Sequence, residues 1–204
     1  ADGPEAKTRA QDKTLPMKHL AINADEINHM EQLIGTTLLN SKLDLQRHKL
    51  NLKKLNFSEL CEKLLSRENT LAQSSQISLD ARIEPGIMLQ GDKSLLSLVV
   101  SNLMDNAIKF SHTGDTIRFR LESTEGNAVL CLENPHPPLS EEALEKIFES
   151  FYRDRNDYGS SLGSGLGLTI TKKIVAMHHG AIRARNTPKG ILLEAALPLS
   201  RQTP

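Results

Sequence analysis

The chain has 204 residues, and its 25 basic and 25 acidic side chains give a formal net charge of zero at pH 7. This balance gives no support for nucleic acid or an anionic membrane surface as a partner, and no nucleic-acid partner is expected. The length allows one or two domains with a proper core. Cys61 and Cys131 lie far apart in apolar stretches without metal-ligand spacing, so buried, reduced thiols are expected rather than a disulfide.

Residues 1–16 are polar, contain Gly and Pro, and are expected to form a flexible N-terminus. From Met17 to about Leu45, apolar residues recur on alternating three- and four-residue steps, which predicts one long amphipathic helix. Such a helix cannot bury its stripe alone. It is either a core helix of the following domain or pairs with another helix or its own copy, and the heptad-like spacing favours pairing. Residues 17–51 are therefore assigned as a dimerisation segment.

Residues 52–110 combine helical and strand patterns. Ser58 is expected to cap a helix that runs to about Ala72. Alternation in 77–83 and a short run at 87–90 predict two strands separated by a Pro-Gly turn. Asp92 then opens a strongly apolar helix that continues to residue 110.

The remainder of the chain predicts an antiparallel sheet with two more helices. Residues 116–134 read as a hairpin around Glu125-Gly126-Asn127, and Ser140 is expected to cap a helix over 140–151. After a glycine-rich loop, a helix ends at Gly180 and two strands follow. Mixed helices and hairpins predict an α+β fold, a two-layer α/β sandwich, for residues 52–204.

The glycine-rich loop contains Gly163, Gly165 and Gly167 just before a helix. A Walker loop needs Lys-Ser/Thr directly after its last glycine, whereas Leu168-Thr169 follows here. A dinucleotide-binding fingerprint would follow a strand and keep GxGxxG spacing, and this loop does neither. Two general interpretations of the loop remain. Its glycines let backbone N–H groups approach an anion at the helix N-terminus, or the loop is a flexible connector before a capped helix.

A polar face marks the apolar helix, because Asn102, Asn106 and Lys109 recur at helical spacing. A buried amide is costly unless it is satisfied, so two asparagines on such a helix need a reason. Either Asn106 offers its carbonyl oxygen to Mg²⁺ and Lys109 meets a phosphate, or these residues tie the helix to a neighbouring loop. Taken alone, the spacing leaves both interpretations open.

The segments NLMDNAIKF, LEKIFESFYR and GSGLGLTITKKIV and a closing LPL strand occur in this order. Together they resemble the catalytic ATP-binding domain of bacterial sensor histidine kinases, which has the Bergerat fold shared with gyrase, the Hsp90 chaperone and MutL. The resemblance covers roughly residues 52–200. The upstream helix resembles the second helix of the dimerisation and phosphoacceptor hairpin in these kinases.

The resemblance implies a two-component protein-histidine kinase that uses ATP and Mg²⁺ and transfers the γ-phosphoryl group to a histidine outside this fragment. It further implies a homodimer through the N-terminal helix, and a response-regulator receiver domain as a partner of the parent kinase. The fragment is then expected to be the cytoplasmic portion of a parent protein in the bacterial inner membrane.

By resemblance, the polar face of the helix belongs to the nucleotide site. Asn106 is the Mg²⁺ ligand, and Asn102 lines the same pocket one turn earlier. Lys109 would contact phosphate, and Phe110 would form a wall of the pocket. In gyrase-like ATPases a glutamate that activates water takes the place of Asn102. Because an amide cannot act as a general base, phosphoryl transfer is expected rather than efficient ATP hydrolysis.

By the same resemblance, the segment after residue 147 heads a flexible lid over the nucleotide, and the glycine loop closes over the triphosphate. Arg153 would reach the γ-phosphate. The residues that match these motifs are Phe148, Phe151, Arg153, Gly163, Gly165 and Gly167.

The chain departs from the family at the adenine end. The first glycine box, normally Asp-x-Gly-x-Gly, reads Asn134-Pro-His136-Pro-Pro138. Asn134 would still accept a hydrogen bond from adenine, as a weaker and uncharged acceptor, whereas the prolines restrict the chain. Ile191 follows Gly190 where the family often has a threonine. These departures predict weakened or altered nucleotide binding.

None of the seven histidines has the acidic residue and nearby proline that follow a phosphoacceptor in these kinases. The chain is therefore expected to be a fragment, or a kinase-like protein without its own acceptor. Two functions remain open: the catalytic domain of a sensor histidine kinase, or a kinase-like interaction and regulatory module with weak or no nucleotide binding.

Overall fold

A computed structural model describes residues 34–41, 43, 49–153 and 164–200. The chain divides into two compact units, residues 1–41 and 42–204, and each is described by itself. In the first unit, residues 34–41 are helical, as expected for that part of the predicted long helix. Apart from residue 43, which is also helical, the rest of that helix and the expected flexible terminus lie outside the described residues. The domain boundaries after residues 16 and 51 stay predictions.

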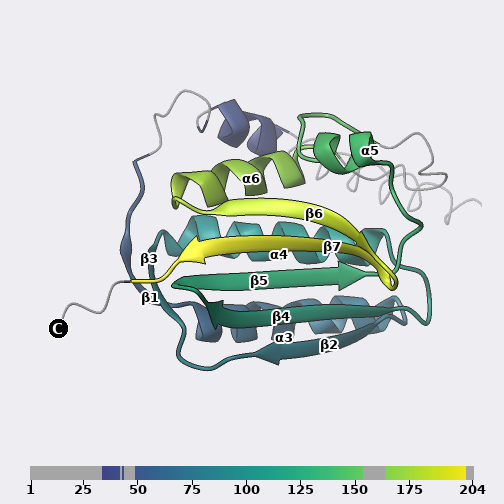
Figure 1. Ribbon diagram of the computed structural model, residues 1–204, viewed down its shortest axis with the longest axis horizontal. Coiled ribbons are helices and arrows are strands. Elements are labelled where there is room, and N and C mark those ends of the chain that lie inside the picture. The colour runs from purple at the N-terminus through teal and green to yellow at the C-terminus, as the bar shows by residue number, and fades with distance from the viewer. Residues whose placement is uncertain (1–33, 42, 44–48, 154–163, 201–204) are drawn as a thin grey trace, which may run out of the picture. The chain divides into compact units, whose positions relative to one another are not determined.

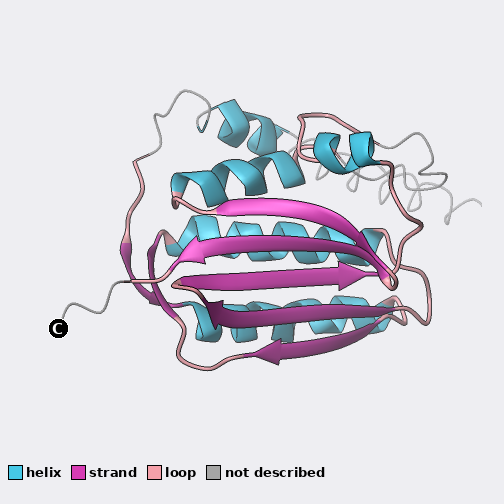
Figure 2. Cartoon of the chain, viewed as in Figure 1, coloured by secondary structure: helices cyan, strands magenta, loops and turns pink. Residues whose placement is uncertain are grey.

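The second unit consists of a layer of helices packed on a five-stranded sheet (Figure 1; Figure 2), which confirms the predicted two-layer α/β sandwich. β2 and β4 are parallel, and every other neighbouring pair is antiparallel. Across the sheet, the strands are β2 (Ser78–Ile83), β4 (Thr116–Thr124), β5 (Asn127–Asn134), β7 (Gly190–Pro198) and β6 (Ala181–Thr187). β1 (Lys53–Asn56) and β3 (Met88–Gly91) form a separate antiparallel pair.

The helices lie against one face of this sheet, with α3 (Phe57–Ser74) on β2, α4 (Lys93–Lys109) on β5 and α6 (Gly167–Met177) on β6 and β7. Alternation along β4 explains the core, because Ile117, Phe119 and Leu121 are buried while the residues between them point to the other face. α4 lies between α3 and α6 and is apolar on most of its surface.

Several predicted helix boundaries were wrong, including the end of α6, which is Met177 rather than Gly180. The cap of α3 is Asn56, whose side chain accepts a hydrogen bond from the Glu59 amide at 3.3 Å. Ser58 lies inside the helix, where its hydroxyl donates to the Glu84 carbonyl at 2.6 Å and accepts from the Ile87 amide at 3.0 Å. Ser58 therefore joins α3 to the turn before β3, a role that its local sequence does not reveal.

The helix predicted over 140–151 is shorter than expected. α5 spans only Glu141–Lys146, capped by Ser140 as predicted. It cannot continue to residue 151 because Phe151 has a φ of +65°, in the left-handed region, and its amide bonds to the Gly165 carbonyl at 3.0 Å. A contact with a distant segment thus ends the helical stretch.

A buried histidine fixes the end of α6 to the start of α4. His178 is 5% exposed, and its Nε2 accepts a hydrogen bond from the Asp92 amide at 3.0 Å. Its Nδ1 lies 2.8 Å from the Ile174 carbonyl, so the neutral ring donates from Nδ1 and accepts at Nε2. Asp92 caps α4 as predicted, accepting from the amides of Ser94 and Leu95.

Candidate functional site

The polar face of α4 is directed at the start of α6. Asn102 Nδ2 donates to the Gly167 carbonyl at 3.2 Å and lies 3.5 Å from Thr171 Oγ1. A Cβ on Gly167 would come within 3.9 Å of the Asn102 amide carbon, so the two helices approach closely here. Asn102 therefore ties α4 to α6, which is one of the two roles that the spacing allowed.

Asn106 and Lys109 continue this face toward the C-terminus of α4. Asn106 is half-buried, and its side-chain amide has no hydrogen-bond partner among the described residues. Lys109 is exposed in the last turn of α4. Burial raises the pKa of the neighbouring Asp105 carboxyl, while the positive charges of Lys109 and Arg67 lower it. An amide oxygen and an ammonium group one turn apart suit a hard cation and a phosphate, respectively.

The N-terminus of α6 faces this region without a side-chain cap. Leu166 precedes the helix and makes no side-chain hydrogen bond, so no described side chain satisfies the amides of the first turn. α3, α4 and α5, by contrast, each have a capping side chain. Uncapped amides at a helix N-terminus attract anions.

The backbone before α6 requires glycine at position 165. Its φ is +66°, and a Cβ there would lie 2.8 Å from Phe151 Cα. The Phe151 amide also bonds to the Gly165 carbonyl, so the phenylalanine-rich segment and the glycine loop meet here. Phe148 is buried beside them, with Lys172 Nζ 5.6 Å from the centre of its ring. Arg153 is exposed, and Gly163 lies outside the described residues.

The degenerate glycine box lies against the C-terminal end of α4. The rings of Phe110 and His136 meet edge to face, with centroids 6.1 Å apart. Asn134 is 6% exposed, and its Nδ2 donates to the Pro135 carbonyl at 3.3 Å. Gly190 is required beside it, because a Cβ at that position would come within 2.0 Å of the Asn134 carbonyl oxygen.

Several polar groups near these helices were not anticipated from the sequence. Thr171 is completely buried and lies beside Asn102, and the hydroxyls of Thr169 and Ser111 are buried without a hydrogen-bond partner. Their local sequences give no signal of burial, since Thr171 is next to Lys172 and Ser111 is next to His112. Among the described residues, no group of three His, Cys, Asp or Glu side chains forms a metal site.

The chain resembles known proteins over most of its length. Residues 91–201 match the family described as histidine kinase-, DNA gyrase B- and HSP90-like ATPase. The sensor protein DltS of Streptococcus agalactiae is 38% identical over 174 residues, which cover 85% of this chain and 44% of DltS. The chain thus spans less than half the length of this curated relative.

Solved structures of histidine kinases have the same fold. The mycobacterial sensor histidine kinase MprB is 30% identical with a TM-score of 0.64, covering 72% of this chain and 97% of MprB. The histidine kinase ThkA, in complex with the response regulator protein TrrA, has a TM-score of 0.72 at 21% identity. That alignment covers 100% of this chain and 55% of ThkA and shows the fold alone. Within the described ranges, no helix has the length and apolarity that crossing a bilayer requires.

Proposed function

Because the chain belongs to the histidine kinase-, DNA gyrase B- and HSP90-like ATPase family, with sensor kinases as relatives, we propose that it binds Mg-ATP for transfer of the γ-phosphoryl group to a histidine. The observation that carries the proposal is the placement of the α4 asparagine face against the uncapped N-terminus of α6. The Asn102–Gly167 hydrogen bond of 3.2 Å holds the two together. In this proposal the Asn106 amide oxygen, the Lys109 ammonium group and the first amides of α6 act on the same bound nucleotide.

Each residue of this region has a defined task in the proposal. The Asn106 amide oxygen would hold Mg²⁺, and Lys109 would bind phosphate as a point charge. Gly165 and Gly167 let the backbone before α6 approach the phosphates, and Arg153 would reach the γ-phosphate. The rings of Phe110 and His136 would line the pocket for the adenine base. When bound, ATP would supply the phosphoryl group and Mg²⁺ would neutralise part of its charge, and positioning by these residues would account for most of the catalysis.

Transfer to a histidine is favoured over hydrolysis. The Asn102 amide donates to the Gly167 carbonyl, and an amide has no basic group with which to activate water. We infer that the acceptor is a histidine of the parent kinase, that the parent dimerises through the helical segment 17–51, and that a response-regulator receiver domain is its partner. The complex of ThkA with TrrA supports that kind of partner. On the same basis we place this chain in the cytoplasmic portion of an inner-membrane kinase.

A second candidate is a kinase-like regulatory module that binds nucleotide weakly or not at all. The degenerate box favours it, since Asn134 is nearly buried and its amide nitrogen bonds to the adjacent Pro135 carbonyl. An uncharged amide oxygen is a weaker hydrogen-bond acceptor for adenine than an aspartate carboxylate is. The two candidates share the fold and differ in whether Mg-ATP binds.

Titration calorimetry with Mg-ATP separates them. We expect the wild-type chain to bind Mg-ATP weakly, and the Asn106→Ala chain to lose the Mg²⁺-dependent part of the binding without losing its fold. Asn127→Ala, at the opposite end of β5 from the site, is the matched control and should bind like the wild type. Equal Mg²⁺-dependent binding by the wild-type and Asn106→Ala chains would remove Asn106 from the site. No binding by any of the three chains would favour the regulatory module.

A further inference from the structure

The edge of the sheet at β2 carries main-chain groups that no described strand covers (Figure 1). The Ser78 amide bonds inward to the Asp115 carbonyl at 2.9 Å, and the Glu84 amide bonds inward to the Leu121 carbonyl at 2.8 Å. Because these groups alternate in direction along a strand, those of the odd-numbered residues 79, 81 and 83 point away from β4, toward the open edge.

The side chains of β2 are arranged so that two copies of the strand, placed antiparallel, would complement each other. Leu79 and Ile83 are half-buried on the helix side of the sheet, and the small residue Ala81 is exposed between them. On the other face lie Asp80 and Arg82, with opposite charges, one on each side of Ala81. Reversing the strand about Ala81 therefore places an acid opposite a base and an apolar residue opposite an apolar residue.

Arg82 has a like charge beside it within one copy of the chain. It lies opposite Arg120 in the parallel ladder, and like charges at such positions are destabilising. Asp80 pairs with Arg82 at 3.8 Å, but the Arg82 side chain is 70% exposed, and Arg120 has no ion pair with any described residue. On the same face, by contrast, Arg118 is paired with Glu133 at 3.6 Å.

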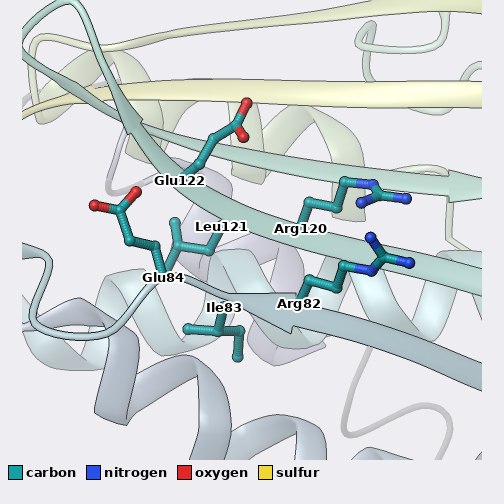
Figure 3. Close-up of a pocket in the computed structure, with 6 residues that line it drawn as sticks. All are labelled: Arg82, Ile83, Glu84, Arg120, Leu121 and Glu122. Carbon is teal, nitrogen blue, oxygen red and sulfur yellow. The ribbon is translucent and has the colours of Figure 1, made fainter.

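A groove beside the edge shows how these charges are arranged (Figure 3). The two guanidinium groups point toward one end of the groove, and two carboxylates lie at the other. The groove has a volume of about 300 Å³ and is lined by Arg82, Ile83, Glu84, Arg120, Leu121 and Glu122. Ser123 donates two hydrogen bonds to Glu84, from its amide at 2.7 Å and its hydroxyl at 2.8 Å, so this carboxylate is held away from the arginine end of the groove.

We propose that a second copy of this chain binds at the β2 edge, the two β2 strands pairing antiparallel about a two-fold axis at Ala81. The outward main-chain groups of Leu79, Ala81 and Ile83 then bond to those of Ile83, Ala81 and Leu79 of the second copy. Each Asp80 lies opposite an Arg82, and each Leu79 opposite an Ile83. The five-stranded sheets join into one continuous sheet.

A second copy fits this edge better than an unrelated acidic segment does. An acidic segment would neutralise Arg82 but would bring its charge next to Asp80, whereas a two-fold arrangement pairs both charges at once. The interface is isologous, so the same strand is used by both copies and neither β2 edge is left open. The small Ala81 side chain at the axis leaves room for the close approach of two strands.

A cysteine cross-link tests the register of the pairing. In an antiparallel pair centred on Ala81, positions 80 and 82 form a non-hydrogen-bonded pair with a Cα separation of about 4.5 Å, within disulfide range. In a Cys131→Ser background, an equimolar mixture of the full-length Asp80→Cys and Arg82→Cys chains should form a disulfide-linked dimer under mild oxidation. The mixture of Arg82→Cys with Glu84→Cys, which needs an axis two residues further on, is the matched control and should cross-link far less.

A charge reversal tests the energetics on the full chain. Asp80→Arg and Arg82→Asp each turn two attractive pairs into repulsive ones, so each should lower the self-association constant by about tenfold or more in sedimentation equilibrium. The double variant restores opposite charges and should recover the association. The N-terminal helical segment is identical in all these chains, so differences between them report on β2 alone.

Two results would overturn the proposal. One is equal cross-linking in the two cysteine mixtures. The other is a self-association constant that neither single reversal changes, or that the double variant fails to restore. In either case we would conclude that the charged side chains of β2 only protect this open sheet edge against pairing with other strands.

Discussion

Replacing Glu68 by methionine is expected to stabilise the fold, by an amount that grows with pH. Glu68 lies on the buried stripe of α3 together with Cys61, Leu65 and Ala72, and it is only 5% exposed. Its Oε2 atom is buried without a hydrogen-bond partner. Burial, and secondly the negative charge of Asp105, raise the pKa of the Glu68 carboxyl above its ordinary value of 4.5.

The magnitude follows from the unpaired oxygen. A buried acceptor without a partner costs about 1–3 kcal/mol, and the cost is higher when the group is charged. Methionine has a similar length and adapts to irregular spaces, so it removes this cost without leaving a large cavity. The positive charge of Arg67 lowers the pKa of Glu68 and offsets part of the effect. We therefore expect the Glu68→Met chain to gain about 1–3 kcal/mol in the free energy of unfolding at pH 8.

The pH dependence has a definite sign. A carboxyl whose pKa is raised by folding binds its proton more tightly in the folded state than in the unfolded chain. Its favourable contribution is complete below the unfolded pKa, near 4.5, and is lost as the pH rises through the folded pKa. The advantage of Glu68→Met should therefore be smallest near pH 4 and increase toward neutral pH.

Urea unfolding of the wild type and the variant at a series of pH values measures this difference. Each kcal/mol corresponds to about 2–4 °C in the melting temperature of a chain of this size. Glu62→Met, at an exposed position of the same helix, is the control and should change stability by less than about 0.5 kcal/mol. A loss of stability in Glu68→Met at pH 8, or a difference that does not vary with pH, would refute the reasoning.

Three further predictions concern the site and its support. Asn134→Asp should tighten Mg-ATP by about 1–2 kcal/mol in calorimetry and leave Mg-GTP unchanged, since one neutral hydrogen bond to adenine becomes charge-assisted. Gly190→Ala should lower the free energy of unfolding in urea by more than about 3 kcal/mol, because its Cβ would overlap the Asn134 carbonyl. Gly86 also has a positive φ but lies in open space, so Gly86→Ala should lower it by only about 1–2 kcal/mol. His178→Leu should cost about 1–3 kcal/mol by removing the ring nitrogen that accepts from the buried Asp92 amide, and an unchanged unfolding midpoint would contradict this.

The predicted site residues lie on segments whose secondary structure follows from their local sequence. The 3.6-residue spacing places Asn102, Asn106 and Lys109 on one face of α4, and this holds whatever α4 packs against. The capping roles of Asp92 and Ser140 were predicted correctly for the same reason, since each side chain bonds to amides two or three residues away. The task of each site residue in nucleotide binding stays a prediction.

Other features could not be predicted because they depend on residues distant in the chain. Ser58 resembles a helix cap, yet its hydroxyl bonds to Glu84 and Ile87 across a turn. The end of α5 depends on the pairing of Phe151 with Gly165. Glu68 on an apolar stripe looks like an exposed residue until α3 packs on α4.

By itself the sequence determined most of the helices and strands and the polar face of α4, because periodicity and capping act between residues a few positions apart. It did not predict β1 or the limits of α3 and α5. Only the tertiary structure decided that Asn102 bonds to Gly167, that β7 lies between β5 and β6, and that β2 is left at an edge. Such pairings join segments tens of residues apart. Their free energy comes from burying surfaces against one another, and no local pattern records which surfaces will meet.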